Sequence, residues 1–134
     1  MSGQDIDALI VGAGPVGLTM AAPLNQHGLT CRIVDKATAP SDKSKALAVW
    51  CRTMELLDGI GLAERFVDSG MKLRGASIYA NCKRIVHLDL TSDESAFGFP
   101  LMIPQYETEH LLIEHLANQG ITVERQVELV NFKE

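Results

Sequence analysis

The chain has 134 residues, and 12 Lys and Arg against 17 Asp and Glu give a formal net charge of −5. A composition of 46% hydrophobic and 22% charged residues is typical of a globular domain, so wholesale disorder is excluded, and the length suits one domain rather than two. The acidic balance argues against nucleic-acid binding, and no apolar run reaches the roughly 18 residues of a membrane helix.

The three cysteines, Cys31, Cys51 and Cys82, are odd in number and form no C-x-x-C pair. This pattern favours free thiols in a reducing cytoplasm over a disulfide framework or a zinc site. The N-terminal residues MSGQDIDALIV contain acidic residues and no basic stretch, so we expect no signal peptide.

The N-terminal quarter of the chain predicts a strand–helix–strand unit. Ala8 to Val11 form a short apolar run typical of a buried strand, and residues 15 to 27 are apolar on most sides of a helix that Gly28 would end. Thr30 to Asp35 then predict a second strand, parallel to the first. Pro23 lies inside the helix and removes a hydrogen-bond donor, so we expect the helix to bend or to end near Ala22.

The rest of the chain predicts an alternation of short helices and strands. Glycines and a turn at Asn81 separate most of these segments, and residues 36 to 44 and Thr91 to Gly98 are expected to be loops. The helices are expected at Arg52 to Leu57, Leu62 to Asp68, and Gln105 to Gln119, the last with Glu107 and Glu109 in its first turn and Leu112, Ile113 and Leu116 buried. The strands are expected at Leu73 to Ala80, Lys83 to Leu90, Ile121 to Glu124, and Val127 to Phe132.

The motif that carries chemistry is G-x-G-x-x-G, formed by Gly12, Gly14 and Gly17 between the first strand and the helix. In dinucleotide-binding folds the three glycines allow a tight turn, close approach of a pyrophosphate, and close packing of helix on strand. Asp35 ends the second strand 18 residues after Gly17, where an acidic residue accepts hydrogen bonds from a ribose. An acid there disfavours a 2′-phosphate and leaves FAD and NAD open. The alternative is a glycine turn that serves helix packing alone.

Four segments together give the chain a family resemblance. They are GAGPVGLT at Gly12 to Thr19, VDK at Val34 to Lys36, SKALAVWCRTMELLDGIGL at Ser44 to Leu62, and PQYETEHLLIEHL at Pro104 to Leu116. They resemble the N-terminal part of the FAD-dependent aromatic hydroxylases, the single-component flavoprotein monooxygenases like para-hydroxybenzoate hydroxylase. The resemblance implies an α/β fold: a Rossmann-like FAD-binding βαβ unit with parallel strands plus a small antiparallel β portion, truncated.

The resemblance also implies a set of cofactor-binding residues. Gly12, Gly14, Gly17 and Asp35 match the half of the site that binds the ADP moiety of FAD. Lys45 stands where the family has an arginine near the flavin, Arg52 matches the arginine of an Arg-Thr pair, and Gln105 matches a glutamine near the cofactor. Arg52 is equally compatible with a local role at a helix end. The implied reaction uses FAD, NADH or NADPH as reductant, oxygen, and a small aromatic substrate.

The later motifs of the family, which complete the sites for flavin and reductant, have no counterpart in the 134 residues. We therefore expect the chain to be the N-terminal part of an FAD-binding domain, with residues 71–103 as the first strands of a substrate region. We assign no catalytic residue and no metal ligand. A truncated nucleotide-binding or association module without activity of its own is the alternative, and missing strands would favour self-association or a partner that supplies the missing C-terminal portion.

Overall fold

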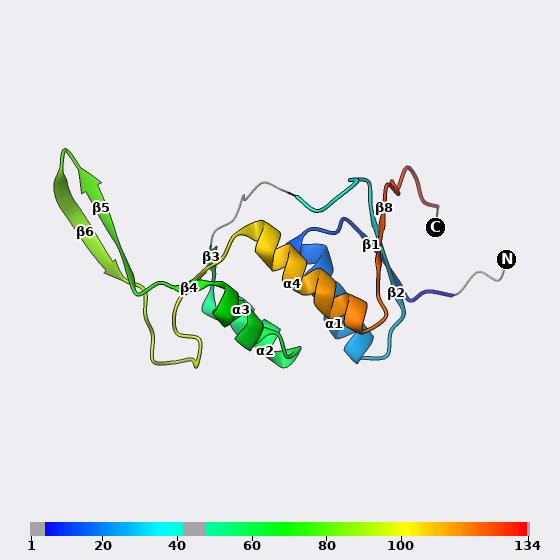
Figure 1. Ribbon diagram of the computed structural model, residues 1–134, viewed down its shortest axis with the longest axis horizontal. Helices are drawn as coiled ribbons and strands as arrows, with labels where there is room; N and C mark the ends of the chain where they lie inside the picture. Colours follow the sequence, from blue (N-terminus) through cyan, green and yellow to red (C-terminus); the bar gives the residue numbers. More distant parts are fainter. Residues whose placement is uncertain (1–4, 42–47, 134) are drawn as a thin grey trace. The chain divides into compact units, whose positions relative to one another are not determined.

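The computed structural model describes residues 5–41 and 48–133, so Lys45 lies outside the described residues. The chain divides into two compact units, which are described separately (Figure 1). Unit 1 combines residues 1–44 with residues 105–134, and unit 2 comprises residues 45–104. Residues far apart in sequence therefore build unit 1.

Unit 1 contains a parallel sheet. Its strands run in the order β1-β2-β8, with β1 and β8 each parallel to β2. Figure 1 shows α1 and α4 together on one side of these strands. The predicted parallel strand–helix–strand unit is confirmed. The elements of unit 1 are β1 (Ala8–Val11), α1 (Pro15–Gln26), β2 (Cys31–Asp35), α4 (Gln105–Asn118) and β8 (Val123–Arg125).

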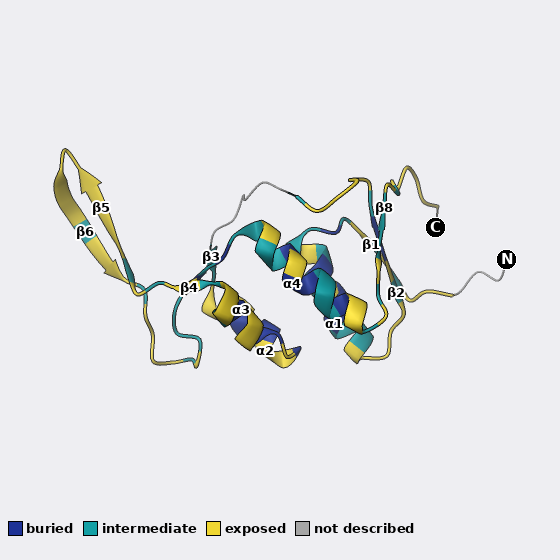
Figure 2. Ribbon diagram, in the orientation of Figure 1, coloured by how far each residue is buried: buried dark blue, intermediate teal, exposed yellow. Residues whose placement is uncertain are grey.

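The core of unit 1 lies between the two helices and the sheet. Apart from Glu109 of α4, the buried residues of α1, β2 and α4 are apolar, and those on the facing surfaces of these elements form the core (Figure 2). In α4, Leu111 is buried and Ile113 only partly so, which corrects the predicted stripe by one residue. The side-chain amide of Asn25 donates to Gln119 at 3.1 Å and joins the C-terminal ends of α1 and α4. The main buried residues are Leu18, Ala21, Ala22, Ile33, Leu111, Leu112 and Leu116.

Three of the helices end at a glycine with positive φ. Gly28 follows α1 with φ +75°, and the Leu29 N–H donates to the Leu24 carbonyl at 3.0 Å. Gly61 and Gly120 make the same arrangement after α2 and α4. These paired hydrogen bonds form a Schellman motif, in which glycine adopts the left-handed conformation without the strain of a Cβ atom.

Unit 2 contains two small antiparallel sheets. One has three strands in the order β3-β7-β4, and the other is the hairpin β5-β6. Asn81 and Cys82 between the hairpin strands both have positive φ, which is typical of a type I′ turn. The elements are β3 (Ala48–Val49), α2 (Cys51–Gly59), α3 (Ala63–Ser69), β4 (Met71–Lys72), β5 (Gly75–Ala80), β6 (Lys83–Asp89) and β7 (Leu101–Met102).

Two predictions about element ends are wrong. Helix α1 continues through Pro23 to Gln26 and does not end near Ala22. Pro23 lies in the last turn and cannot donate to the carbonyl four residues earlier, but the helix continues past it and the Pro23 carbonyl accepts from the His27 N–H at 3.1 Å; a bend there stays a prediction. The predicted strand Val127 to Phe132 is absent, because the chain turns at Gln126 with φ +60° and Val130 is 91% exposed.

Candidate functional site

The glycine motif forms the turn between β1 and α1. Gly12 has φ +103°, a conformation that favours glycine, and its N–H donates to the Val34 carbonyl at 2.8 Å. A Cβ atom on Gly17 would overlap the carbonyl oxygen of Gly12 and lie 3.1 Å from Cγ2 of Ile10. Helix and strand therefore approach each other so closely that only glycine fits at position 17.

Gly14 is the N-cap residue of α1, and Pro15 is the first residue of the helix. A Cβ atom on Gly14 would meet no atom within 4 Å, so the space beside this residue is open. Within residues 5–41 and 48–133, the N–H groups of Gly14, Val16 and Gly17 have no hydrogen-bond acceptor. Such groups, together with the positive end of the helix dipole, form a site for an anion such as a phosphate.

Asp35 ties the glycine turn to the end of β2. Its Oδ2 accepts from the Ala13 N–H at 2.7 Å, and its Oδ1 accepts from the Ala37 N–H at 2.7 Å. Burial raises the pKa of Asp35, but the two N–H donors and the charges of Arg125 and Lys36 outweigh burial and hold the pKa below its ordinary value. The side chain is therefore an anion at neutral pH.

Arg125 at the end of β8 was not found by sequence reasoning. It is paired with Asp35 in the parallel register, and its Nη1 lies 3.4 Å from Asp35 Oδ2. Its Nη2 is buried and has no hydrogen-bond partner in the described part of the chain. The sequence predicted that this strand ends at Glu124, whereas β8 includes Arg125. The prediction therefore left out the residue that pairs with Asp35.

A cavity of about 280 Å³ opens beside this cluster in unit 1. The carboxyl ends of parallel strands are where such sheets bind ligands, and the cavity lies at the ends of β1 and β2. The segment after β8 supplies the other wall, which the sequence had predicted as a strand. The lining residues are Val11, Gly12, Asp35, Lys36, Val127, Glu128 and Leu129.

Gln105 is the first residue of α4. Because α4 precedes β8, which is parallel to β2, its N-terminus lies toward the carboxyl ends of the strands, as the glycine turn does. The Gln105 amide Nε2 donates to Glu109 Oε1 at 2.8 Å. Glu109 is 2% exposed, so its carboxylate is buried within unit 1.

The remaining predicted residues fall elsewhere. Arg52 belongs to unit 2, in α2, where its Nη1 lies 2.9 Å from Glu55 Oε2 and its side chain is 77% exposed. This is a local ion pair within α2. Lys45 is outside the described residues. The structure therefore brings the three glycines, Asp35 and Gln105 into one unit.

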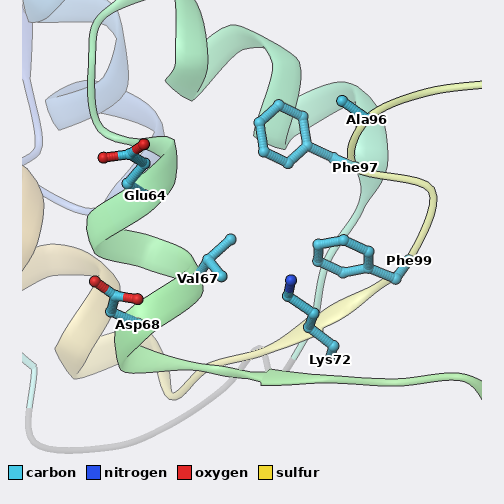
Figure 3. A pocket seen from close by; sticks show the side chains of 7 residues that line it. All are labelled: Glu64, Val67, Asp68, Lys72, Ala96, Phe97 and Phe99. Carbon is cyan, nitrogen blue, oxygen red and sulfur yellow. The ribbon is translucent and has the colours of Figure 1, made fainter.

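Unit 2 has a cavity of its own, of about 440 Å³, shown in Figure 3. Val67 of α3 and the rings of Phe97 and Phe99 face its interior, and the Lys72 ammonium lies 4.6 Å from the centre of the Phe99 ring. None of the predicted site residues lines it.

The described ranges contain neither a metal-binding cluster nor a membrane-spanning helix. No group of three or more His, Cys, Asp or Glu residues could hold a metal ion there. No helix among the described residues has the length and apolar character needed to cross a membrane.

Comparison with known proteins identifies the family of the chain. Residues 5–134 match the model of a family described as FAD binding domain. The chain belongs to this family of FAD-binding domains. The resemblance to FAD-dependent aromatic hydroxylases and the α/β fold class are thereby confirmed.

Relatives of this FAD-binding domain are flavin monooxygenases. The chain is 37% identical to 6-methylpretetramide 4-monooxygenase of Streptomyces rimosus over 92% of its own length and 22% of that protein's. It is 34% identical to pentachlorophenol 4-monooxygenase of Sphingobium chlorophenolicum, covering 82% of this chain and 21% of that one. The chain thus spans about a fifth of the length of these relatives.

Solved structures share the fold. The anhydrotetracycline hydroxylase from Streptomyces rimosus superposes with a TM-score of 0.75 at 37% identity, over 90% of this chain and 24% of that one. The p-nitrophenol 4-monooxygenase from Pseudomonas putida superposes with a TM-score of 0.80 at 21% identity, over 88% of this chain and 31% of that one.

Proposed function

We propose that unit 1 binds the ADP moiety of FAD, as the N-terminal portion of a flavin-dependent monooxygenase that hydroxylates an aromatic or phenolic substrate with NADH or NADPH and oxygen. One observation carries the proposal. The Asp35 carboxylate accepts a hydrogen bond from the glycine turn. It lies beside an open cavity and beside the N–H groups at the start of α1, which have no acceptor in the described part of the chain. N–H groups that can donate to a phosphate thus lie next to a carboxylate that can accept from a ribose hydroxyl.

The residues present fit the ADP moiety. The N–H groups of Gly14, Val16 and Gly17 would hold the pyrophosphate, and the open space beside Gly14 admits it. A carboxylate has about four lone-pair positions, and three contacts to Asp35 leave one for a ribose hydroxyl. The cavity beside Val127 is lined partly by apolar side chains, as an adenine site requires. When bound, the flavin supplies the redox chemistry, and the protein binds and orients it.

FAD is favoured over NADP, because a 2′-phosphate would meet the anionic Asp35. The family match favours FAD over NAD. We extend the cofactor site to Lys45, Arg52 and Gln105 by the family resemblance. Residues 71–103, which contain the antiparallel hairpin of β5 and β6, would begin the substrate region.

The proposal includes three further features of the whole protein. The names of the relatives, which act on pentachlorophenol and p-nitrophenol, support a small aromatic substrate. The reductant, NADH or NADPH, rests on the resemblance alone. The unpaired thiols of Cys31, Cys51 and Cys82 support a reducing location such as the cytoplasm.

A second candidate function is an association module without activity of its own. It is favoured by apolar side chains on the sheet face away from the helices, where Leu9 and Val11 are 43% and 55% exposed. On this reading the chain self-associates or binds a partner through that face, and nucleotide binding is lost or incidental.

A titration of the purified chain with FAD, followed by flavin fluorescence, separates the two candidates. ADP and NAD serve as competitors, and Gly14→Val places a branched side chain in the open space where the pyrophosphate would lie. Saturable FAD binding that ADP displaces and the variant loses supports the cofactor site. If the chain binds none of the three nucleotides, the association module becomes the better description.

A further inference from the structure

Arg125 at the end of β8 places a guanidinium group beside the Asp35 carboxylate. The two residues are paired in the parallel register, and Nη1 of Arg125 lies 3.4 Å from Oδ2 of Asp35. Both side chains are largely shielded from water, with exposed fractions of 18% and 16%. Nη2 of the guanidinium is buried and has no hydrogen-bond partner among residues 5–41 and 48–133. The arginine is thus shielded from water with only part of its hydrogen-bonding capacity satisfied.

The stability of the fold does not explain an arginine at this position. Shielding a guanidinium from water is costly, and the cost is offset only as far as its N–H groups find acceptors. Asp35 is also held by the backbone N–H groups of Ala13 and Ala37, each at 2.7 Å, so its orientation does not depend on Arg125. What Arg125 adds to these two neutral donors is a positive charge.

A positive charge matters here because of the place of Asp35 in the site. Its carboxylate accepts from the N–H of Ala13, and the next residue, Gly14, begins the group of free N–H donors to which we assign the pyrophosphate. An uncompensated carboxylate in this place would repel a pyrophosphate, and salt screens partly buried charges only weakly. A counter-ion beside the carboxylate removes this conflict between the ribose site and the pyrophosphate site.

Lys36 also lines the cavity, but its charge already has a partner. Its Nζ lies 3.5 Å from Oε1 of Glu128, and both side chains are mostly exposed to solvent. The charges of these four groups therefore cancel in pairs, Asp35 with Arg125 and Lys36 with Glu128. Loss of the Arg125 charge alone would leave the four with a net negative charge.

We propose that Arg125 is a positioning residue of the cofactor site, which acts as the counter-ion of Asp35 and so lets a pyrophosphate bind next to the carboxylate that binds the ribose. The proposal rests on the proposed function and deepens it. Arg125 acts through Asp35 and needs no contact with the ligand. Its effect on affinity therefore grows with the negative charge of the ligand, which a purely structural role would not produce.

The test measures dissociation constants of ADP, AMP and adenosine by calorimetry in the wild-type chain and three variants. We expect Arg125→Met to weaken ADP binding about tenfold, AMP binding less, and adenosine binding less than about twofold. Added salt should narrow the difference in ADP affinity between wild type and variant. Arg125→Lys keeps the charge and should keep most of the ADP affinity. Arg125→Gln keeps a donor for Asp35 without the charge and should behave like Arg125→Met.

Arg32→Met is the matched control. Nε of Arg32 in β2 lies 2.6 Å from Oε1 of Glu124 in β8, so this ion pair joins the same two strands as the pair of Arg125 with Asp35. Positions 32 and 35 point to opposite faces of β2, because side chains alternate along a strand. Arg32 does not line the cavity, so we expect Arg32→Met to leave the ADP affinity within about twofold of wild type.

The outcomes separate the proposal from the function on which it rests. Equal losses of affinity for ADP, AMP and adenosine would show a merely structural role for Arg125 and overturn the proposal. Unchanged ADP binding in folded Arg125→Met or Arg125→Gln would also overturn it, with the ADP site still standing. Arg125→Gln serves alone as the neutral variant if Arg125→Met does not fold. A wild-type chain that binds none of the ligands would refute the proposed function, and the counter-ion role with it.

Discussion

At the scale of single residues, Gly14 and Gly17 have different reasons to be glycine. A Cβ atom at position 17 would overlap the Gly12 carbonyl oxygen, whereas one at position 14 meets no protein atom within 4 Å. We expect Gly17→Ala to lower the free energy of unfolding by about 1–3 kcal/mol, because backbone must move to make room. Urea denaturation measures this change directly.

Gly14→Ala is the matched control for that substitution. We expect it to lower the free energy of unfolding by no more than about 1 kcal/mol, because alanine is a poorer N-cap than glycine but no backbone has to move to admit its Cβ atom. Its effect should instead be a weaker affinity for ADP, measured by competition with FAD. If the two alanine variants were equally destabilised, the close approach of α1 to β1 would not be the reason for Gly17.

The pKa of Asp35 makes an acid-dependent contribution to stability. Because its pKa is lower in the folded than in the unfolded chain, the group stabilises the fold above its unfolded pKa, near 3.8, and this contribution is lost as the pH falls through the folded pKa. We expect the wild-type chain to lose stability on acidification below about pH 4 more steeply than Asp35→Asn. Urea denaturation between neutral and acidic pH measures both slopes.

Asp35→Asn should not abolish the acid dependence completely. Asp7, Glu55, Asp89 and Glu124 also have pKa values lowered by their hydrogen bonds, and they remain in the variant. At neutral pH we expect the variant to lose about 1–3 kcal/mol, because the partly buried Arg125 is left without its anionic partner. Parallel pH profiles for the two proteins would contradict the role given to the Asp35 hydrogen bonds.

At the scale of elements, two neighbouring glycines at the end of α2 allow a sharper comparison. Gly61 has φ +75° and closes a Schellman motif, whereas Gly59 is the last residue of the helix and has no positive φ. A Cβ atom at either position meets no atom within 4 Å, so packing does not enter. We expect Gly61→Ala to destabilise the chain by about 1–2 kcal/mol and Gly59→Ala to stabilise it by about 0.5–1 kcal/mol.

Thermal unfolding followed by circular dichroism compares the two variants under the same conditions. The expected melting temperatures lie on opposite sides of the wild-type value. A stabilising Gly61→Ala would mean that the left-handed turn after α2 is not retained in solution. A Gly61→Asn variant should fall between Gly61→Ala and wild type, since asparagine tolerates this conformation better than alanine does.

The elements that sequence reasoning found are those with strong local signals. Apolar periodicity and glycine stops place the four helices within a few residues, and the turn at Asn81 identifies the hairpin. The strands β3, β4 and β7 were missed because each has two residues, too few for an alternation to be read. They form only because segments distant in sequence meet.

The residues of the site likewise include some that the sequence could predict and some that it could not. The glycines and Asp35 belong to a motif whose spacing can be read directly, so they could be predicted. Arg125 and Glu109 could not, because their roles depend on partners 90 and 68 residues away along the chain, Asp35 and Ser41. A partly buried ion pair and a buried carboxylate look in sequence like ordinary charges on a strand and on a helix.

At the scale of the whole molecule, the helices of unit 1 cover only one of the two faces of its parallel sheet. Helices α1 and α4 lie together on one side of the strands, and no other described element of unit 1 covers the opposite face (Figure 1). Parallel sheets are normally covered on both faces. The side chains of Leu9 and Val11 on the uncovered face are apolar and about half exposed, and β1 has an unpaired edge within the described sheet.

We therefore expect the isolated chain to self-associate through this face, with a mass by light scattering that rises with protein concentration. Leu9→Lys places a charge in the face and should weaken association about tenfold, because burial of one leucine contributes about 1.5–3 kcal/mol and 1.4 kcal/mol corresponds to tenfold in affinity.

Met20→Lys is the matched control: Met20 is 54% exposed but lies on α1, on the other side of the sheet. Neither residue lines the nucleotide cavity, so ADP binding should be the same in both variants. A wild-type chain that stays monomeric at every concentration, or a Met20→Lys variant that dissociates as readily as Leu9→Lys, would show that this face does not hold copies together.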